Sequence, residues 1–344
     1  MGDPAGIGPE IVLKVLVPRA DAAFRANTGA TLREPAEAVS ARYIVYGDPG
    51  TLAREARRLG LNPERLEIRA CSSLPADLPM GRIDPRAGDA AFLAVRQAAR
   101  DAMAGKVRAV VTAPLNKEAM NAAGHRYPGH TEILAEIAGG VPVRMMLAND
   151  ELRTVLVTIH QPLRRAIAAL TTDLVAETIR LTHRHLQATG IAAPRIAVAG
   201  LNPHAGEGGL MGREEIDIIA PAIERACRDG IDATGPHAPD TVFMRARGFA
   251  QFDVVVAMYH DQGLIPLKYL GLEDGVNITV GLPFVRTSPD HGTAFDIAGQ
   301  GRADTRSLSA AIRMAERLSW PVEAAGIPAV AATGTAWTND PEPG

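Results

Sequence analysis

Short apolar runs that end in polar residues dominate the hydrophobic pattern of the chain. The clearest run, Val254–Met258, stops at the polar sequence Tyr-His-Asp-Gln of residues 259–262. An apolar run of this length is typical of a strand buried on both faces of a parallel sheet. Ligands bind beyond the carboxyl ends of such strands, so we expect His260 to point into a ligand crevice rather than into the core.

The same pattern occurs twice upstream of His260. The apolar residues 154–159 lead directly into His160, and residues 195–199 lead through Gly-Leu-Asn-Pro into His204. Neutral imidazole is the commonest nitrogen ligand of zinc, and three protein ligands with one open position are typical of a catalytic metal site. One such histidine alone is more simply a hydrogen-bonded polar residue at a strand end. The repeated placement, however, favours a shared metal.

Predicted helices alternate with predicted strands along the rest of the chain. Pro9 suits the first turn of an N-terminal helix, Thr51 is a plausible N-cap, and His183 and His185 are assigned to the solvent face of their helix. We predict strands at 42–46 and 107–111, helices at 51–59, 89–103, 174–186 and 214–228, a surface loop at 27–41 and a turn at 235–241. This alternation predicts a mainly parallel α/β architecture.

The chain opens with a glycine-rich turn, Gly2–Pro9, that enters the first helix. Such a loop normally follows a strand, so we expect either that the natural start lies upstream of Met1 or that a first strand has been lost. Neither a G-x-G-x-x-G sequence after a strand nor a Walker lysine is present. Packing of a tight turn is therefore favoured over phosphate binding.

Two further polar segments indicate contacts with an anion. Lys117 follows the predicted strand 107–111, and it is either a ligand for an anionic substrate or a solvated lysine at a helix start. Gly129-His130-Thr131 opens a predicted helix, where free backbone N–H groups, a hydroxyl and an imidazole suit a phosphate or carboxylate. The simpler alternative is that Thr131 only caps the helix.

The composition favours a protein that acts on small molecules. The 344-residue chain is 47% hydrophobic and 22% charged, which is ordinary for two globular domains or one large α/β unit. Its net charge of −3 gives no electrostatic reason to expect nucleic acid or a membrane as a partner. No apolar run approaches the roughly 20 residues that span a bilayer, no signal peptide opens the chain, and Cys71 and Cys227 form no CxxC motif. We therefore expect a cytoplasmic protein.

Several segments together resemble a known enzyme family. Residues 290–301, Asp-His-Gly-Thr-Ala-Phe-Asp-Ile-Ala-Gly-Gln-Gly, resemble the cofactor loop of the isocitrate and isopropylmalate dehydrogenase superfamily. Five more segments resemble, in sequence and order, the 4-hydroxythreonine-4-phosphate dehydrogenase family of pyridoxal phosphate biosynthesis: Gly2–Pro9, Thr112–Lys117, Gly129–Thr131, Asn202–Glu207 and Tyr259–Gly263. The resemblance departs near the N-terminus, where the family usually has a strand before the glycine-rich loop and a shorter segment at 27–41.

The resemblance implies a fold of two α/β/α domains of the isocitrate and isopropylmalate dehydrogenase type, with an active-site cleft between them. The first domain would comprise residues 1–120 and 288–335, and the second would comprise residues 121–287 with the dimer interface. Residues 336–344 would form a tail. The protein would be a homodimer with its active site at the subunit interface.

The resemblance also implies a metal and a phosphorylated substrate. The metal ligands would come from both subunits and would be His160, His204 and His260. Zinc is the usual metal of the family, with magnesium, cobalt, manganese and nickel as alternatives. His130 and Thr131 would bind the substrate phosphate, and the rest of the substrate would contact Lys268, Asn277 and Arg286.

A nicotinamide cofactor, NAD or NADP, follows from the same resemblance. Its implied contacts are Asp240, His291, Gly292, Thr293 and Asp296. The candidates for the catalytic base are Lys117, Asp261 and a metal-bound water, and the sequence does not choose among them.

The implied reaction is oxidation of the 3-hydroxyl of 4-(phosphooxy)-L-threonine, with hydride passing to the cofactor. Loss of carbon dioxide from the resulting β-keto acid would give 3-amino-2-oxopropyl phosphate. A divalent cation assists both steps as a Lewis acid, while arginine and lysine hold carboxylate and phosphate groups.

Three alternatives stay open at this stage. The substrate could be 4-phospho-D-threonate or 4-phospho-D-erythronate, on which one relative in the family acts. A second relative oxidises a cyclic diol dicarboxylate without phosphate, and the Gly129–Thr131 segment argues against that substrate. A non-catalytic protein that binds phosphorylated metabolites is the alternative from another class, and the three histidines after strands argue against it.

Overall fold

A mixed eight-stranded sheet forms the centre of the protein. The computed structural model describes residues 1–17, 41–271 and 274–319, so the predicted tail at 336–344 and nearly all of the predicted loop at 27–41 lie outside the described residues. Along the sheet the strands are β3 (Ala109–Val111), β10 (Val285–Pro289), β9 (Val276–Val280), β4 (Arg144–Ala148), β5 (Arg153–Leu156), β8 (Val254–Ala257), β6 (Ile196–Ala199) and β7 (Ala233–His237). Two further strands, β1 (Ile44–Gly47) and β2 (Glu67–Ala70), form a separate parallel pair.

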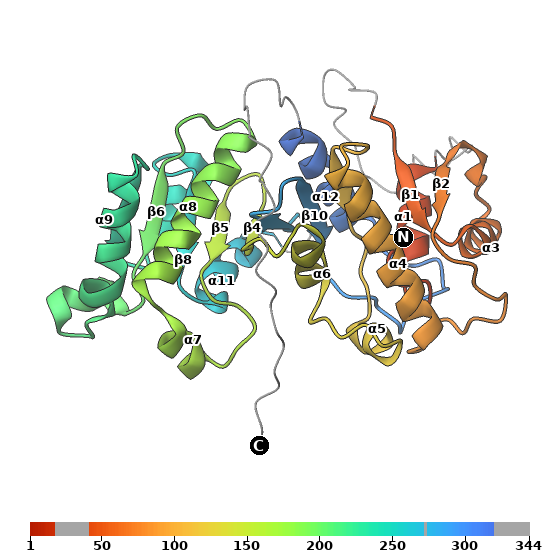
Figure 1. Ribbon diagram of the computed structural model, residues 1–344, viewed down its shortest axis with the longest axis horizontal. Helices are drawn as coiled ribbons and strands as arrows, with labels where there is room; N and C mark the ends of the chain where they lie inside the picture. The colour runs from red at the N-terminus through yellow and green to blue at the C-terminus, as the bar shows by residue number, and fades with distance from the viewer. Residues whose placement is uncertain (18–40, 272–273, 320–344) are drawn as a thin grey trace.

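Helices cover the central sheet on both faces. Figure 1 shows α8 and α9 beside β6 and β8 at one end of the molecule, and α3 beside β1 and β2 at the other. The helices are α1 (Gly8–Leu16), α3 (Pro49–Leu59), α4 (Pro85–Met103), α5 (Lys117–Ala122), α6 (His130–Ile137), α7 (Leu163–Ala169), α8 (Thr172–Ala188), α9 (Ala220–Arg228), α10 (Val242–Ala246), α11 (His260–Leu270) and α12 (Arg306–Leu318). Within the described ranges, no helix has the length and apolar character needed to cross a membrane.

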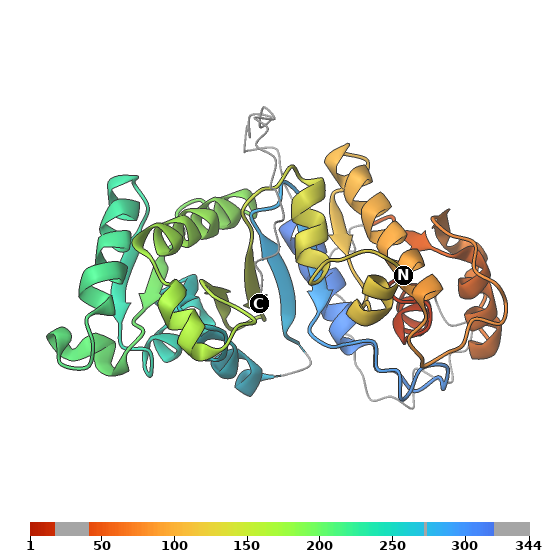
Figure 2. The same cartoon turned by 60° about the horizontal axis from the view of Figure 1, so that its bottom comes forward.

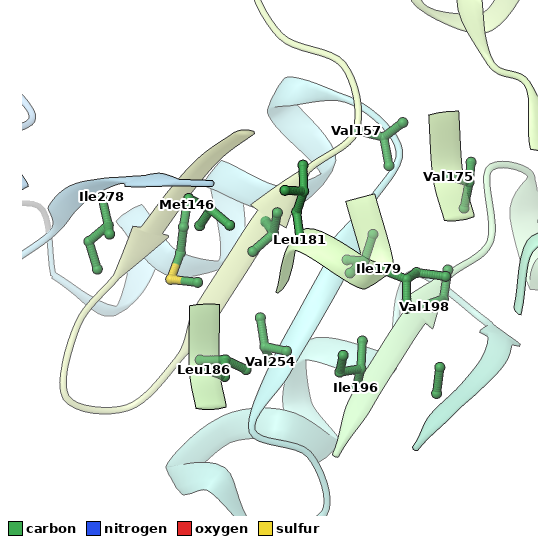
Figure 3. Packing of buried hydrophobic residues seen from close by; sticks show 14 of the residues in the cluster. Met146, Val157, Val175, Ile179, Leu181, Leu186, Ile196, Val198, Val254 and Ile278 are labelled. Atoms are coloured by element: carbon green, nitrogen blue, oxygen red, sulfur yellow. The ribbon is translucent and has the colours of Figure 1, made fainter. Parts of the chain in front are cut away.

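Strand β8 explains why the apolar runs of the sequence are continuous rather than alternating. Val254 and Val256 pack into the larger core cluster with residues of α8, α9 and α12, whereas Val255 and Ala257 pack into a second cluster with residues of α10 and α11. All four side chains are fully buried. Successive strand residues point to opposite faces, so a strand covered on both faces must be apolar at every position. Figure 3 shows the larger cluster, with Val254 between Leu186 and Ile196.

The centre of the sheet is antiparallel, a feature that the alternation of predicted helices and strands does not indicate. Strand β4 pairs antiparallel with both β5 and β9, and β9 pairs antiparallel with β10. Figure 2 shows β4 and β9 side by side in the middle of the molecule. The β4–β5 hairpin turns at Asn149, whose side-chain oxygen accepts hydrogen bonds from the backbone N–H groups of Glu151 and Leu152, both at 2.8 Å. The remaining pairs are parallel, so the mainly parallel prediction is confirmed outside this centre.

Several predicted boundaries were wrong because the capping residue lies earlier in the chain. Helix α3 begins at Pro49, and the N-cap is Asp48, whose carboxylate accepts from the N–H of Thr51 at 2.6 Å. Thr51 is therefore not the cap. Helix α4 likewise begins at Pro85 after the cap Asp84, four residues before the predicted start. An acidic residue followed by proline is a common way to begin a helix.

Two other local predictions were also wrong. The predicted turn at 235–241 begins inside β7. His183 and His185 do not lie on the solvent face of α8: both are half-buried, and each has one ring nitrogen buried without a partner among the described residues. Burial and the nearby charge of Arg153 lower the pKa of His185 to about 4. The prediction failed because alternate positions near the end of a long helix do not reveal which neighbour covers them.

The predicted division into domains stays a prediction. Strand β10 (Val285–Pro289) spans the proposed boundary between residues 287 and 288, and it pairs with β3 on one side and β9 on the other. The central sheet therefore continues through both proposed domains.

Candidate active site

The three histidine-bearing segments leave neighbouring strands of the sheet. Strands β5, β8 and β6 are adjacent and parallel, and the segments after their carboxyl ends carry His160, His260 and His204. Parallel neighbours place their carboxyl ends at the same edge of a sheet, where α/β proteins bind ligands. The prediction that three histidines follow buried strands is therefore confirmed.

His160 and His260 line one cavity of about 470 Å³ beyond the ends of β5 and β8. Their ring centroids are 5.6 Å apart. Nδ1 of His260 lies 2.7 Å from Oδ1 of Asp261, so this carboxylate orients the ring and a ligand would bind at Nε2. Burial, the ammonium of Lys117 and His260 all lower the pKa of His160, which favours the neutral imidazole that metal ions bind.

His204 lies apart from this pair. Its side chain is exposed on the loop Pro203–Gly209. Within residues 1–17, 41–271 and 274–319, no three His, Cys, Asp or Glu side chains lie close enough together to hold a metal ion. A single chain therefore brings two of the three predicted ligands together.

A second polar group surrounds the start of α6. The N-cap of this helix is Gly129, and no side chain caps it, so the alternative that Thr131 only caps the helix is wrong. Lys117 begins α5 and also reaches this turn, since a Cβ built on Gly129 would lie 4.0 Å from its Nζ. Helix α5 is held close to α4 by Gly88, where a Cβ would lie 2.2 Å from the carbonyl carbon of Ala119.

Arg286 and His130 supply two buried donors to this group. Arg286 is 3% exposed, and its Nη1 and Nη2 donate to the hydroxyls of Thr279 at 3.1 Å and Thr112 at 2.7 Å. Nε of Arg286 and Nε2 of His130 are buried and have no hydrogen-bond partner among the described residues. Buried donors are normally satisfied, so this pair beside the positive end of a helix fits an anionic ligand.

The pKa shifts of Arg286 and His130 agree with an anionic ligand at this position. Burial lowers the pKa of Arg286 to about 10, and the carboxylate of Glu132 opposes that shift. Burial, followed by the charge of Arg286, lowers the pKa of His130 well below its ordinary value. The cluster is therefore short of negative charge, which a phosphate or carboxylate would supply.

Lys268 and Asn277 border the same region. Lys268, on α11, forms an ion pair with Asp290 at 2.7 Å. Asn277 faces Ser288 across the β9–β10 ladder, and it lies on the same face of β9 as Thr279, the partner of Arg286, because side chains alternate along a strand. The carboxylate of Asp290 also raises the pKa of His160, against the overall lowering. This interaction connects the histidine cavity with the cationic cluster.

The predicted cofactor loop packs against the N-terminal glycine-rich turn. The N–H of Ile7 donates to the carbonyl of Thr293 at 3.0 Å, and a Cβ on Gly6 would lie 2.9 Å from Thr293. A Cβ on Gly2 would lie 2.5 Å from the carbonyl oxygen of Pro114. These close contacts confirm that the glycine-rich turn serves packing.

The residues predicted to contact the cofactor fall into two places. Thr293 is buried, whereas His291, Gly292 and Asp296 are exposed, and no described atom lies within 4 Å of a Cβ built on Gly292. Asp240 follows β7, six strands from β10 in the sheet order, which is about 29 Å at a strand spacing of about 4.8 Å. One chain therefore does not bring Asp240 to the other four residues.

Three residues of this region had no functional role assigned to them from the sequence alone. Thr112 and Asp290 were present in quoted segments but had no assigned role, and Glu132 directly follows Thr131. A carboxylate in the first turn of a helix that begins with a possible anion site was the available signal. The pairings Lys268–Asp290 and Arg286–Thr112 join residues that are not neighbours in the sequence. No local sequence pattern therefore indicates them.

Comparisons with known proteins agree with the geometry. The chain matches the family described as pyridoxal phosphate biosynthetic protein PdxA over residues 39–315. A relative from Beijerinckia indica, named 4-hydroxythreonine-4-phosphate dehydrogenase, is 53% identical over 336 residues, which cover 93% of this chain and 94% of the relative. A relative from Salmonella typhimurium, named D-threonate 4-phosphate dehydrogenase, is 44% identical over 338 residues, which cover 93% of this chain and 97% of the relative.

A solved structure shows the same fold. The crystal structure of a 4-hydroxythreonine-4-phosphate dehydrogenase from Klebsiella pneumoniae is similar with a TM-score of 0.80 and 42% identity, covering 93% of this chain and 98% of that chain. The resemblance inferred from the sequence motifs and the mixed α/β fold are both confirmed.

Proposed function

Because this chain belongs to the PdxA family of pyridoxal phosphate biosynthetic proteins, we propose that it is a metal-dependent dehydrogenase that uses NAD or NADP. Its substrate is 4-(phosphooxy)-L-threonine, whose C3 gives a hydride to the nicotinamide while its hydroxyl loses a proton. The β-keto acid then loses carbon dioxide to give 3-amino-2-oxopropyl phosphate.

The observation that carries this proposal is the buried cationic cluster at the start of α6. Nε2 of His130 and Nε of Arg286 are buried donors without partners among the described residues, and the hydroxyl of Thr131 is not used as a cap. A phosphate bound by His130, Thr131 and the helix N-terminus would accept these hydrogen bonds. Lys268 and Asn277 would then hold the rest of the substrate, and Arg286 would contact both that part and the phosphate.

The donor set at the histidine cavity fits a divalent cation. His160 and His260 present two imidazoles on one cavity wall, and Asp261 orients His260 through Nδ1. A cation such as zinc at this position would supply Lewis acidity to the reacting alcohol and ketone. His204 of a second subunit would complete the ligand set, because His204 lies apart from the pair within one chain.

The candidates for proton transfer are Lys117, Asp261 and a metal-bound water. Asp261 lines the cavity and its carboxylate already bonds to His260, which gives it an orienting role as well. Lys117 begins α5 beside Gly129, and its positive charge contributes to lowering the pKa of both His130 and His160. Lys117 therefore lies between the phosphate cluster and the histidine cavity, as Asp290 does.

The cofactor would bind against the loop that begins at Asp290. The open space beside Gly292 and the exposed side chains of His291 and Asp296 suit an extended ligand. Thr293 is buried against the glycine-rich turn, which would hold the loop in place. Asp240 would reach a cofactor only from a second subunit.

A homodimer with the active site at its interface is supported by exposed apolar side chains near all three histidine segments. Large hydrophobic residues are exposed on α7 after His160, on the segment after His204 and on α11 after His260, namely Leu163, Ile167, Leu210, Met211, Ile216, Ile265 and Tyr269. Apolar surface of this extent marks an interaction site. Sedimentation of Tyr269→Lys, a change at a residue that is 91% exposed, should show a shift toward monomer and a loss of bound metal.

Two other functions are the alternatives to this proposal, and the first has specific support. Relatives named D-threonate 4-phosphate dehydrogenase are 44% identical to this chain, so 4-phospho-D-threonate and 4-phospho-D-erythronate are the second candidate substrates. A non-catalytic binder of phosphorylated metabolites would keep the cationic cluster but would not need the paired imidazoles.

We also propose the cytoplasm as the location, because both cysteines are free thiols, which suits a reducing compartment.

The experiment that tests the proposal is a turnover screen of the three phosphorylated acids with NAD and with NADP, after metal analysis of the purified protein. The highest kcat/KM with 4-(phosphooxy)-L-threonine supports the main proposal. A higher value with either sugar acid would move the function to the second candidate. Binding of all three compounds without turnover or bound metal would identify a non-catalytic binder.

A further inference from the structure

The loop that carries His204 has an unusual backbone. His204, Ala205, Gly206, Glu207 and Gly208 have φ values of 50°, 53°, 82°, 45° and 65°. The left-handed region is unfavourable for residues with a side chain, because the Cβ approaches the following carbonyl oxygen. Three of the five residues have a Cβ, so other contacts must hold this loop in place.

The carboxylate of Glu215 holds the backbone just before the left-handed residues and lies close to Gly206 within them. Glu215 begins a π-helical turn, Glu215–Ile219, and is 2% exposed. Its Oε1 accepts from the backbone N–H groups of Leu201 and Asn202, both at 2.7 Å, and its Oε2 accepts from Nδ2 of Asn202 at 2.9 Å. A Cβ on Gly206 would lie 2.6 Å from Oε2, so the loop also wraps closely around the carboxylate.

The start of this loop is tied to the other two histidine segments. Gln262 accepts from the N–H of Met258 at 2.7 Å and donates from Nε2 to the carbonyl of Gly200 at 2.7 Å. The hydroxyl of Thr158 donates to the carbonyl of Met258 at 2.7 Å. These hydrogen bonds fix the segments after β5, β8 and β6 to one another. Glu215 extends the hydrogen-bonded network from Gly200 to Leu201 and Asn202, at the start of the loop.

We propose that Glu215 is a positioning residue that holds the left-handed loop in the conformation that presents His204 to the metal. The inference rests on the proposed function, because it requires His204 to be a ligand. Glu215 lies under the backbone just before His204 and bonds to groups there, so it acts through the loop. Residues that orient metal ligands from the second layer typically change metal affinity ten- to a hundred-fold when they are replaced.

The test is a titration of metal-free, full-length protein with Co²⁺, followed by its visible absorption spectrum, and with Zn²⁺ in competition. Glu215→Gln keeps the size of the side chain but removes its charge and places an NH₂ group where the loop offers donors. We expect Co²⁺ affinity to fall about ten- to a hundred-fold, with an altered spectrum, at a temperature where circular dichroism shows a folded protein.

Asp217→Asn is the matched control. Asp217 is in the same π-helical turn, its side chain is exposed, and its carboxylate pairs with Arg213. The same change from carboxylate to carboxamide should leave Co²⁺ affinity and the spectrum unchanged. A second variant, Glu215→Asp, keeps the charge but withdraws the carboxylate from the loop, and we expect a smaller loss of affinity with the fold retained.

Rescue separates positioning from general stability. Glu207 is exposed with φ 45°, and Glu207→Gly removes the steric cost of that conformation. Added to Glu215→Gln, it should recover part of the lost Co²⁺ affinity. Wild-type Co²⁺ affinity in either folded Glu215 variant would overturn the inference about Glu215. If His204→Ala still loses its metal in that case, His204 stays a ligand and the proposed function is unaffected. Full metal binding by His204→Ala would instead refute the ligand assignment itself and the inference with it.

Discussion

Arg286→Met should separate ligand binding from stability. Arg286 is a buried cation that has two threonine hydroxyls as hydrogen-bond partners and no ion pair within hydrogen-bonding distance among the described residues. Such a charge is unfavourable in the free protein and becomes favourable once an anion binds. Methionine occupies a similar volume without charge, so it removes both effects together.

The magnitude follows from the pKa of the guanidinium. Burial lowers this pKa from its ordinary value to about 10, and a lowering by roughly two to three pH units corresponds to about 3 kcal/mol at 1.36 kcal/mol per unit. The folded-state pKa lies below the unfolded value, so the cost is fully present at every pH below about 10, including pH 7. Loss of the two hydrogen bonds to Thr279 and Thr112 offsets this gain or exceeds it, since bonds from a charged donor are each worth about 1.5–3 kcal/mol, or about 3–6 kcal/mol together.

We therefore expect Arg286→Met to change the unfolding free energy by only about −3 to 0 kcal/mol, because the relief of the buried charge compensates much of the loss of the two hydrogen bonds. Protection by a fixed phosphate concentration should fall by half or more, from about 2.7 kcal/mol to about 0.4–1.4 kcal/mol. A ligand at about 100 times its Kd stabilises a protein by about 2.7 kcal/mol, and loss of one charge-assisted contact weakens binding about ten- to a hundred-fold. Urea unfolding with and without inorganic phosphate measures both quantities.

Arg144→Met is the control for loss of a half-buried arginine. Arg144 pairs with Glu177 at 2.7 Å and donates to Thr178 at 2.8 Å, on the strand β4. Its replacement should lower the unfolding free energy and leave the phosphate effect intact. The reasoning fails if Arg286→Met lowers the unfolding free energy by more than about 3 kcal/mol and phosphate still protects the variant as it protects the wild type.

Three further predictions concern the other parts of the site. Thr131→Val should lower kcat/KM about ten- to a hundred-fold on the phosphorylated substrate and scarcely change residual activity on the dephosphorylated analogue; an equal loss on both would remove Thr131 from the phosphate site. Gly292→Val should leave the fold intact, because no described atom lies within 4 Å of the new Cβ, and steady-state kinetics should show a larger rise in cofactor KM than in substrate KM. Burial raises the pKa of Asp3 from 3.8 to about 6, so its carboxyl stabilises the fold at low pH and that contribution is lost as pH rises through 6; Asp3→Asn should add up to about 3 kcal/mol at pH 7.5 and almost nothing at pH 4 in urea unfolding.

Strand positions could be predicted where burial on both faces makes every residue apolar. The runs that became β8 and β6 were found for this reason, and so were the polar segments after them. Strands β4 and β9 were missed although most of their residues are buried. Their antiparallel pairing depends on contacts between residues about 130 positions apart, such as Met146 and Ile278, and no local pattern records such a pairing.

Site residues could be identified by type but not by partner. His130 and Thr131 were predicted from the chemistry of a helix N-terminus, and the structure adds that Arg286 lies deep enough to be short of a counter-charge. His160 and His260 were predicted as ligands of one site, and they share a cavity. His204 was predicted by the same rule, yet its side chain is exposed on a loop apart from them.

The position of His204 follows from forces that a strand pattern does not contain. The segment after β6 turns into a left-handed loop, and the acidic side chain that supports it, Glu215, lies 13 residues beyond Asn202. The loop therefore leaves the direction of its strand, whereas His260 begins a helix directly after β8. Exposed apolar residues follow this loop at Leu210, Met211 and Ile216. An exposed imidazole on this loop beside apolar surface fits the proposed site at a subunit interface, where a second copy of this chain would offer the matching pair of imidazoles.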